Sequence, residues 1–340
     1  MKVFHWQSKK GNFGDDLNLW LWPELMGESI HLKPDSTLVG VGTVLSSRHL
    51  PDSGSIYVFG SGTGYGNVSK EIYKNYKNIQ GVRGPLSAKI LKLDPSYILA
   101  DPAILIPDII PSSIVNSGSK PVIFIPHIES LELANWEEIC NKCNIELVNA
   151  TDDSKAVINK IANASLVLAE SMHAAIIADA YRIPWIPVWT SKKISRFKWC
   201  DWALAVGAKV KPIELSSPTF AMKFNNFSAK ITAFNDADLK SADFDADVCT
   251  SSIIKEYEEL VNKRNSGARK LLKKCLNKIN PLVLKVSPLI SKALRLEKKT
   301  IESLLKLKGY NGVLSETEQL NQAKNRLYTR LDDFRETISK

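Results

Sequence analysis

The sequence contains few cysteines and no long apolar run. Its five cysteines are an odd number, and only Cys140 and Cys143 form a C-x-x-C pair. This pattern gives neither a disulfide framework nor a zinc site, so we predict no metal and no resident cofactor. No segment is apolar over the length that a spanning helix needs, and no signal segment precedes the first predicted strand. We therefore expect a cytoplasmic protein.

Acidic residues are scarce between residues 263 and 308. This segment carries 14 Lys or Arg but only two acidic residues, a local net charge of +12, whereas the whole chain carries +9. Leucines and isoleucines recur among the lysines with the spacing of amphipathic helices, which we expect to break at Pro281 and Pro288. The segment suits either peripheral contact with an anionic membrane, at the inner face of the plasma membrane, or an ordinary helical tail or oligomer contact. No recognition motif accompanies the charge, so no nucleic-acid partner is predicted.

Elsewhere the chain alternates predicted strands with glycine-rich turns and helices. Such alternation is typical of α/β proteins with parallel sheets. A turn-rich linker over residues 109–119 separates two series of strands. We predict two Rossmann-like domains, residues 1–112 and 120–240, each doubly wound and facing a central cleft in the GT-B-like manner. A basic helical C-terminal extension is expected over residues 245–340.

His173 is the first candidate for chemistry. It follows a predicted strand over residues 165–169 and begins an apolar helix, so it should lie at the carboxyl end of a parallel sheet, where ligands bind. An imidazole titrates near neutral pH and can move protons. Glu170 and Ser171 connect this strand to the helix. His127 follows another predicted strand and is equally suited to orient the backbone or a ligand.

A glycine-containing loop follows the first predicted strand and opens a helix. Its glycines, one of them Gly14, allow an anion or a sugar to approach the backbone beside Asn12. Asp15 and Asp16 come next. They either cap the helix or accept a proton from a sugar hydroxyl.

A second glycine loop, residues 60–66, contains Gly62 and Thr63 and also follows a strand. It allows close approach of an anion or a sugar, the alternative being a flexible surface loop. Arg83 ends the next strand, directly before a helix that begins at Pro85, and its guanidinium can grip a carboxylate or a phosphate.

A short strand is predicted over residues 185–188. Four cationic side chains follow it and are interleaved with three aromatic residues. They are Lys192, Lys193, Arg196 and Lys198. Either they reach the predicted cleft or they form a basic surface loop.

Five motifs occur in order within the first 205 residues. They read G-N-F-G-D-D-L-N, G-S-G-T-G-Y-G, G-V-R-G-P-L-S-A, D-P-A-I-L and E-S-M-H-A-A-I-I-A-D-A-Y-R-I-P. Together they resemble the polysaccharide pyruvyl transferase family, nearest to its succinoglycan-type members. The resemblance implies a GT-B-like enzyme that moves the enolpyruvyl unit of phosphoenolpyruvate onto a sugar of an exopolysaccharide or cell-surface glycan precursor. The product would be a cyclic pyruvate ketal.

The same resemblance implies roles for single residues. His173 matches the family's histidine, the general acid and base, Arg83 matches the arginine that holds the donor, and Lys193 stands where the family has a donor-binding lysine. Lys192 is a neighbouring competitor for that contact. Many members carry Arg at the position of Ser171, and Arg196 or Lys198 is the candidate to replace it.

Further contacts are assigned to residues already introduced. Gly62, Thr63 and Ser171 are expected to complete the donor site, and Asp15 and Asp16 are further catalytic candidates. The acceptor site is assigned to Asn12, Gly14, Glu170 and His127. The acceptor sugar, lipid-linked or free, is not defined by the sequence.

Two other functions compete with pyruvyl transfer. A GT-B glycosyltransferase that uses a nucleotide sugar would need the same architecture and anion-binding loops. A non-catalytic scaffold of a polysaccharide assembly complex at the membrane would use the basic segment alone.

Overall fold

The computed structural model describes residues 1–46, 50–52, 54–112, 119–232, 246–264 and 266–340. Every structural statement below concerns these residues. The central part of the predicted linker, residues 113–118, lies outside them.

The first sheet is parallel and has four strands in the order β1-β2-β3-β4. The strands are β1 (Lys2–Phe4), β2 (Thr37–Val39), β3 (Ile56–Ser61) and β4 (Ile79–Val82). Each strand pairs with the next one in the chain, so the order never reverses. The expectation of a doubly wound first unit is therefore wrong, because a doubly wound sheet needs a reversal of strand order.

The second sheet is also parallel, with the order β6-β5-β7-β8-β9. Its strands are β5 (Val122–Ile125), β6 (Glu146–Leu147), β7 (Leu166–Ala169), β8 (Trp185–Trp189) and β9 (Ile213–Glu214). The chain moves from β5 to one side and then crosses to the other, so this unit is doubly wound as predicted. The switch point lies between β5 and β7, and ligands bind at such points, outside the carboxyl ends of the strands.

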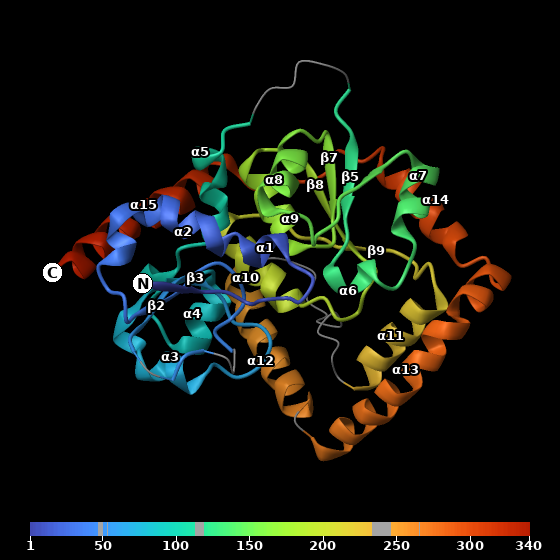
Figure 1. Ribbon diagram of the computed structural model, residues 1–340, viewed down its shortest axis with the longest axis horizontal. Coiled ribbons are helices and arrows are strands. Elements are labelled where there is room, and N and C mark those ends of the chain that lie inside the picture. Colours follow the sequence, from blue (N-terminus) through green and yellow to red (C-terminus); the bar gives the residue numbers. More distant parts are fainter. Residues whose placement is uncertain (47–49, 53, 113–118, 233–245, 265) are drawn as a thin grey trace.

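Helix α9 (Met172–Ala180) follows β7 and lies in the centre of the molecule. All nine of its residues are buried, so the helix is covered by protein on every side rather than on one face. Helix α8 (Ser154–Ala162) packs beside it, as does α1 (Phe13–Asp16) beside α8. This packing places the loop after β1 next to the start of α9 (Figure 1).

The two units share a continuous apolar core that α15 (Thr317–Ser339) completes. Polar contacts also cross between the units. The main-chain N–H of Phe13 donates to the carbonyl of Ala150 at 3.0 Å, and the indole of Trp20 donates to Ser154 Oγ at 2.9 Å. The loop after β1 and the helix α2 (Asn18–Met26) are therefore docked on the second unit.

The C-terminal region is helical, as predicted, and wraps around both units (Figure 1). Helix α12 (Ala246–Arg264) packs on α4 (Pro85–Leu91) and α10 (Arg196–Val206), and α14 (Glu297–Leu307) packs on α7 (Trp136–Cys143). Helix α15 returns to the first unit. There the ring of Phe334 lies 5.3 Å from that of Tyr57 and 6.1 Å from that of Phe59, measured between centroids.

Helix α13 (Gly267–Ala293) runs without interruption through Pro281 and Pro288, so the expected breaks are wrong. Both prolines are exposed, which leaves the carbonyl groups that lose their helical partner open to water. Tertiary contacts also hold the helix. Ser287 and Ser291 accept hydrogen bonds from the first main-chain N–H groups of α11 (Phe220–Ile231), at 2.8 and 2.9 Å. Among the described residues, no helix combines the length and the apolar content needed to cross a bilayer.

Phe334 tests whether α15 is part of the core. We expect Phe334→Ala to lower the free energy of unfolding by about 3–5 kcal/mol, because a buried aromatic ring is lost and a cavity remains. Phe227, which is 57% exposed, is the matched control, and Phe227→Ala should change stability by less than about 0.5 kcal/mol. Urea denaturation of both variants measures the difference, and equal losses would contradict this packing role.

Candidate active site

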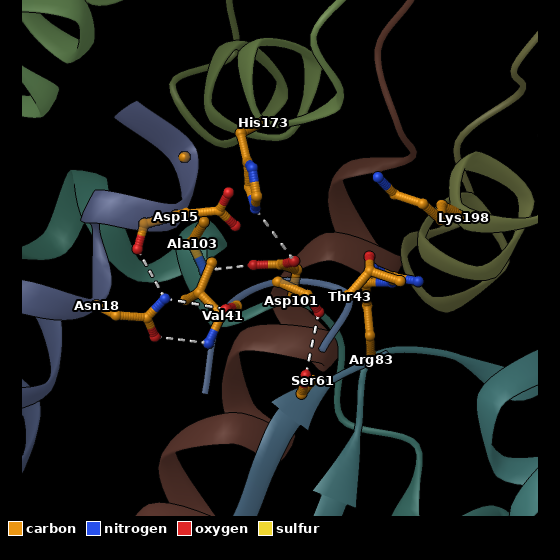
Figure 2. Close-up of polar contacts among 12 residues, drawn as sticks. Asp15, Asn18, Val41, Thr43, Ser61, Arg83, Asp101, Ala103, His173 and Lys198 are labelled. Atoms are coloured by element: carbon orange, nitrogen blue, oxygen red, sulfur yellow. Dashed lines mark hydrogen bonds and ion pairs between the residues drawn. The ribbon is translucent and has the colours of Figure 1, made fainter. Parts of the chain in front are cut away.

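His173 lies in the first turn of α9 and points toward the loops that follow the first sheet (Figure 2). Its Nε2 atom is 3.8 Å from Oδ2 of Asp101, too far for a direct hydrogen bond. Both atoms are buried, and neither has a hydrogen-bond partner among the described residues. His173 is 8% exposed and Asp101 is fully buried. Buried polar atoms of this kind require an explanation, and a bound ligand or water that joins the two would supply it.

Gly14 packs directly against the imidazole of His173. A Cβ atom at this position would lie 2.0 Å from Nδ1 of the ring, so no other residue fits. The sequence suggested that Gly14 lets an anion or a sugar approach the backbone. In the structure the group that approaches is the side chain of His173 itself.

The two neighbouring aspartates of the first loop have different surroundings. The carboxyl of Asp15 points toward His173 and Asp101 (Figure 2). Its Oδ2 accepts a hydrogen bond of 2.5 Å from the side-chain amide of Asn12. Asp16 instead accepts the main-chain N–H of Asn12 at 3.1 Å. Asn12 in turn caps α1 through the N–H of Gly14. Asp16 and Asn12 therefore shape the loop, and Asp15 is the carboxyl that borders the site.

Asn18 anchors this loop to the first sheet and was not singled out in the sequence. Its fully buried amide donates to the carbonyls of Asp15 and Val41, and its Oδ1 accepts from Val41 N–H and the Trp22 indole, all at 2.9 Å. The loop bearing Asp15 is thus fixed relative to the end of β2 (Figure 2).

Asp101 is also a residue that sequence reasoning missed, although it begins the D-P-A-I-L motif. Its Oδ1 caps the short helix of residues 102–105 by accepting the N–H of Ala103 at 3.0 Å. Capping explains one carboxylate oxygen only. The other oxygen faces His173, and the signal in the sequence was an aspartate in a family motif that had received no role.

Arg83 is fully buried and lies at the end of β4. Its guanidinium donates to Oδ2 of Asp201 at 3.0 and 3.1 Å, to the carbonyl of Thr63 at 3.2 Å and to Oγ1 of Thr43 at 2.7 Å. A Cβ atom at Gly62 would lie 2.3 Å from this guanidinium, so the glycine makes room for Arg83. Thr63 is buried as well, and its carbonyl orients Arg83. Four of the five N–H bonds of Arg83 thus go to the protein.

Lys198 is the cation whose charge reaches the site. It lowers the pKa values of Asp15, Asp101, His127 and His173. Its ammonium group donates to the hydroxyl of Tyr65 at 2.5 Å and lies 4.5 Å from the centre of that ring. Tyr65 is 53% exposed. Arg196 begins the same helix α10 but lies about 200° away around its axis, on a different face.

His127 and Glu170 lie at the switch point of the second sheet. Both oxygens of the buried Glu170 accept main-chain N–H groups, from His127 at 3.0 Å, Thr190 at 2.8 Å and Ser191 at 3.1 Å. Glu170 therefore ties together the carboxyl ends of β5, β7 and β8. Ser171, also buried, precedes α9 at its N-cap position.

The adjacent lysines of the following loop point in different directions. Lys193 lies 3.6 Å from Glu129 and lowers the pKa of His127, so it belongs to the His127 side of the site. Lys192 pairs with Glu214 and lines a separate cavity of about 550 Å³ that includes Lys223 and Lys299. The charge of Lys193 therefore acts on His127, whereas Lys192 faces the separate cavity.

Burial shifts the proton affinities of the central groups in opposite directions. It lowers the pKa of His173 to about 3, and the charges of Lys198 and Arg83 act in the same sense. It raises the pKa of Asp15 to about 7 and that of Asp101 to about 6, against the charges of Lys198 and Arg83 respectively. Burial also lowers the pKa of His127 to about 4. At neutral pH the site therefore holds a neutral imidazole beside carboxyl groups that burial makes easier to protonate than ordinary ones.

The arrangement has what acid–base chemistry on an anion requires. A neutral imidazole, two buried carboxyl groups and the charges of Lys198 and Arg83 come together at one place between the units.

Comparisons with known proteins assign the chain to a family. The polysaccharide pyruvyl transferase family model matches residues 53–192. The chain is 41% identical over 212 residues to the succinoglycan biosynthesis protein ExoV of Rhizobium meliloti (strain 1021), a match that covers 62% of this chain and 67% of that protein. No solved structure matches significantly. The chain belongs to the polysaccharide pyruvyl transferase family, as its motifs suggested.

The Arg83–Asp201 pair is open to a stability test. We expect Asp201→Ala to lower the free energy of unfolding by about 3–5 kcal/mol, because it leaves the buried guanidinium without its counter-charge. Replacing both partners by apolar residues, in Arg83→Met/Asp201→Leu, should recover part of that loss. Chemical denaturation measures both variants. If Asp201→Ala were as stable as the unchanged protein, the ion pair would not be what holds the two units together at the site.

Asp101 predicts a pH dependence of stability. Burial raises its pKa in the folded protein to about 6, above the unfolded value of 3.8, so its ionisation destabilises the fold. The loss of stability is absent below pH 3.8, grows as the pH rises from there to about 6, and is complete above that. Asp101→Asn stays neutral and should be more stable than the unchanged protein at pH 8, by up to about 3 kcal/mol, and equally stable at pH 4. Urea denaturation at both pH values tests this. The exposed Asp152→Asn is the control, and a destabilised Asp101→Asn at pH 8 would contradict the assignment.

Proposed function

We propose that the protein transfers the pyruvyl unit of phosphoenolpyruvate to a sugar of an exopolysaccharide precursor and forms a pyruvate ketal there. Family membership supports a pyruvyl transferase. The observation that carries the proposal is a pair of buried atoms, His173 Nε2 and Asp101 Oδ2, that have no hydrogen-bond partner in the described part of the chain and lie between Asp15 and Lys198. Two parallel sheets whose carboxyl ends meet at this cluster support a GT-B-like arrangement of the units.

The reaction needs one proton to arrive and two to leave. Protonation of the methylene carbon of phosphoenolpyruvate places positive charge on its second carbon, which one sugar hydroxyl attacks and so loses its proton. The bond between this carbon and the phosphate oxygen then breaks. A second hydroxyl closes the ring and gives up its proton. One hydroxyl proton balances the proton on the new methyl group, and the other leaves with phosphate.

The shifted pKa values support an assignment of the base and the acid. A neutral His173 accepts a proton from an attacking hydroxyl, and the resulting imidazolium is stabilised by the carboxylate of Asp101. Asp15, with a pKa of about 7, is partly protonated at neutral pH and supplies the proton to the methylene carbon. We therefore retain His173 as the base and move the acid role to Asp15.

The cations offset the charge of the donor. From the second unit, the charge of Lys198 acts on both histidines and that of Lys193 acts on His127. From the first unit, the charge of Arg83 acts on His173. Their combined field favours a ligand with both carboxylate and phosphate groups and stabilises the departing phosphate. Because four N–H bonds of Arg83 serve the protein, its contribution to donor binding is chiefly electrostatic.

His173→Ala tests the proposal. With phosphoenolpyruvate and a panel of acceptor oligosaccharides, the unchanged protein should add the mass of pyruvate less one water, and His173→Ala should do so at least about a hundredfold more slowly. The control is His31→Ala, at an exposed histidine, which should keep full activity. Near-normal turnover by His173→Ala would remove this residue from the mechanism.

Donor choice is tested separately by thermal denaturation. Phosphoenolpyruvate should raise the midpoint of unfolding, whereas nucleotide sugars should not, because only a ligand that binds the folded state stabilises it. Stabilisation by a nucleotide sugar alone would favour a glycosyltransferase instead.

A further inference from the structure

Helix α13 carries a row of leucines that nothing in the described part of the chain covers. Leu271, Leu282 and Leu289 are 65%, 62% and 76% exposed. Their intervals of eleven and seven residues place them within about 20° of one another around the helix. They form one straight apolar row, named here the leucine row.

A row of lysines runs parallel to the leucine row. Lys274, Lys285 and Lys292 each come three residues after a leucine of the leucine row, which places them about 60° to one side of it. Lys278 has the same relation to Cys275, which lies beside the leucine row. All four are exposed, and none of the 27 residues of α13 is acidic. These four side chains are named here the lysine row.

A third face of α13 is buried against the protein, so the leucine row and the lysine row face outward. Leu276, Val283, Ser287 and Ser291 are buried, and the two serines bind the start of α11. This buried face lies about 150° from the leucine row. Figure 1 shows α13 at the outer edge of the molecule, with α11 beside it.

We propose that α13 docks flat on the surface of an anionic lipid bilayer, with the leucine row in the acyl boundary and the lysine row among the headgroups. An apolar row beside a row of one charge is the pattern of helices that lie in the membrane interface. Charge selects this occupant over a second copy of the chain, because pairing two such faces would bring two lysine rows together. The proposal does not depend on the function proposed above.

Vesicle binding tests the docking surface with the full chain. In co-sedimentation at about 0.1 M salt, the protein should bind vesicles of mixed neutral and anionic phospholipids and not neutral ones. Leu282→Ser/Leu289→Ser and the fourfold Lys→Gln variant of the lysine row should each weaken binding at least about tenfold, because the first removes apolar burial in the bilayer and the second removes attraction to anionic headgroups.

Matched variants control for general loss of apolar or basic surface. Leu19→Ser/Leu32→Ser removes leucines that are 60% and 49% exposed in the first unit, and Lys70→Gln/Lys77→Gln/Lys92→Gln/Lys120→Gln removes exposed lysines elsewhere. Both should bind vesicles like the unchanged protein. Equal binding by the α13 variants and their controls would overturn the proposal.

Cys275 supplies a local readout that activity and folding do not affect. It is exposed and lies within about 40° of the leucine row, whereas Cys140, Cys143 and Cys200 are buried. With Cys249→Ser in place, a polarity-sensitive fluorophore on Cys275 should brighten on addition of anionic vesicles. No change in emission would overturn the proposal. So would a dimer seen by light scattering without lipid that becomes a monomer in Leu282→Ser/Leu289→Ser.

Discussion

The ion pair between Arg83 and Asp201 is the contact on which the site depends. It joins the end of β4 to α10, and so joins the two units at full burial. Asp201 also accepts the main-chain N–H and the hydroxyl of Ser87 at the start of α4, at 2.9 and 2.7 Å, which satisfies a carboxylate that could not otherwise be buried. Because Arg83 binds the carbonyl of Thr63, the same pair sets the glycine loop after β3. The position of Lys198, one turn before Asp201, follows from it.

This contact limits how a donor can enter. Separation of the two units would break this pair and expose the apolar core that they share to water, which is costly. The groups at the edge of the site that are free to rearrange are side chains instead. Tyr65 is half exposed and contacts Lys198 through its hydroxyl and its ring, so these two side chains can move without displacing either sheet. Such movement belongs to the nanosecond range rather than to slow domain motion.

Local patterns predicted the parts of the fold that local forces determine. The strand before His173 and the helix after it were recognised because both are apolar runs bounded by polar residues, and Arg83 was placed correctly at a strand end. The partners of these residues were not predicted, because Asp101 and Asp201 reach them only through tertiary packing. Hydrophobic periodicity does not indicate the order of strands in a sheet either. The expected reversal of strand order in the first sheet was therefore wrong. At Pro281 the intrinsic preference for a helix break was overridden by packing on α11.

The return of α15 to the first unit has a consequence for synthesis of the chain. The aromatic cluster beneath β3 contains Tyr57 and Phe59, and also Phe334, which is synthesised long after them. Domains made first usually fold first during translation. Here the apolar face beneath β3 stays partly open until α15 has been made, so the first sheet cannot complete its packing when its own strands are finished.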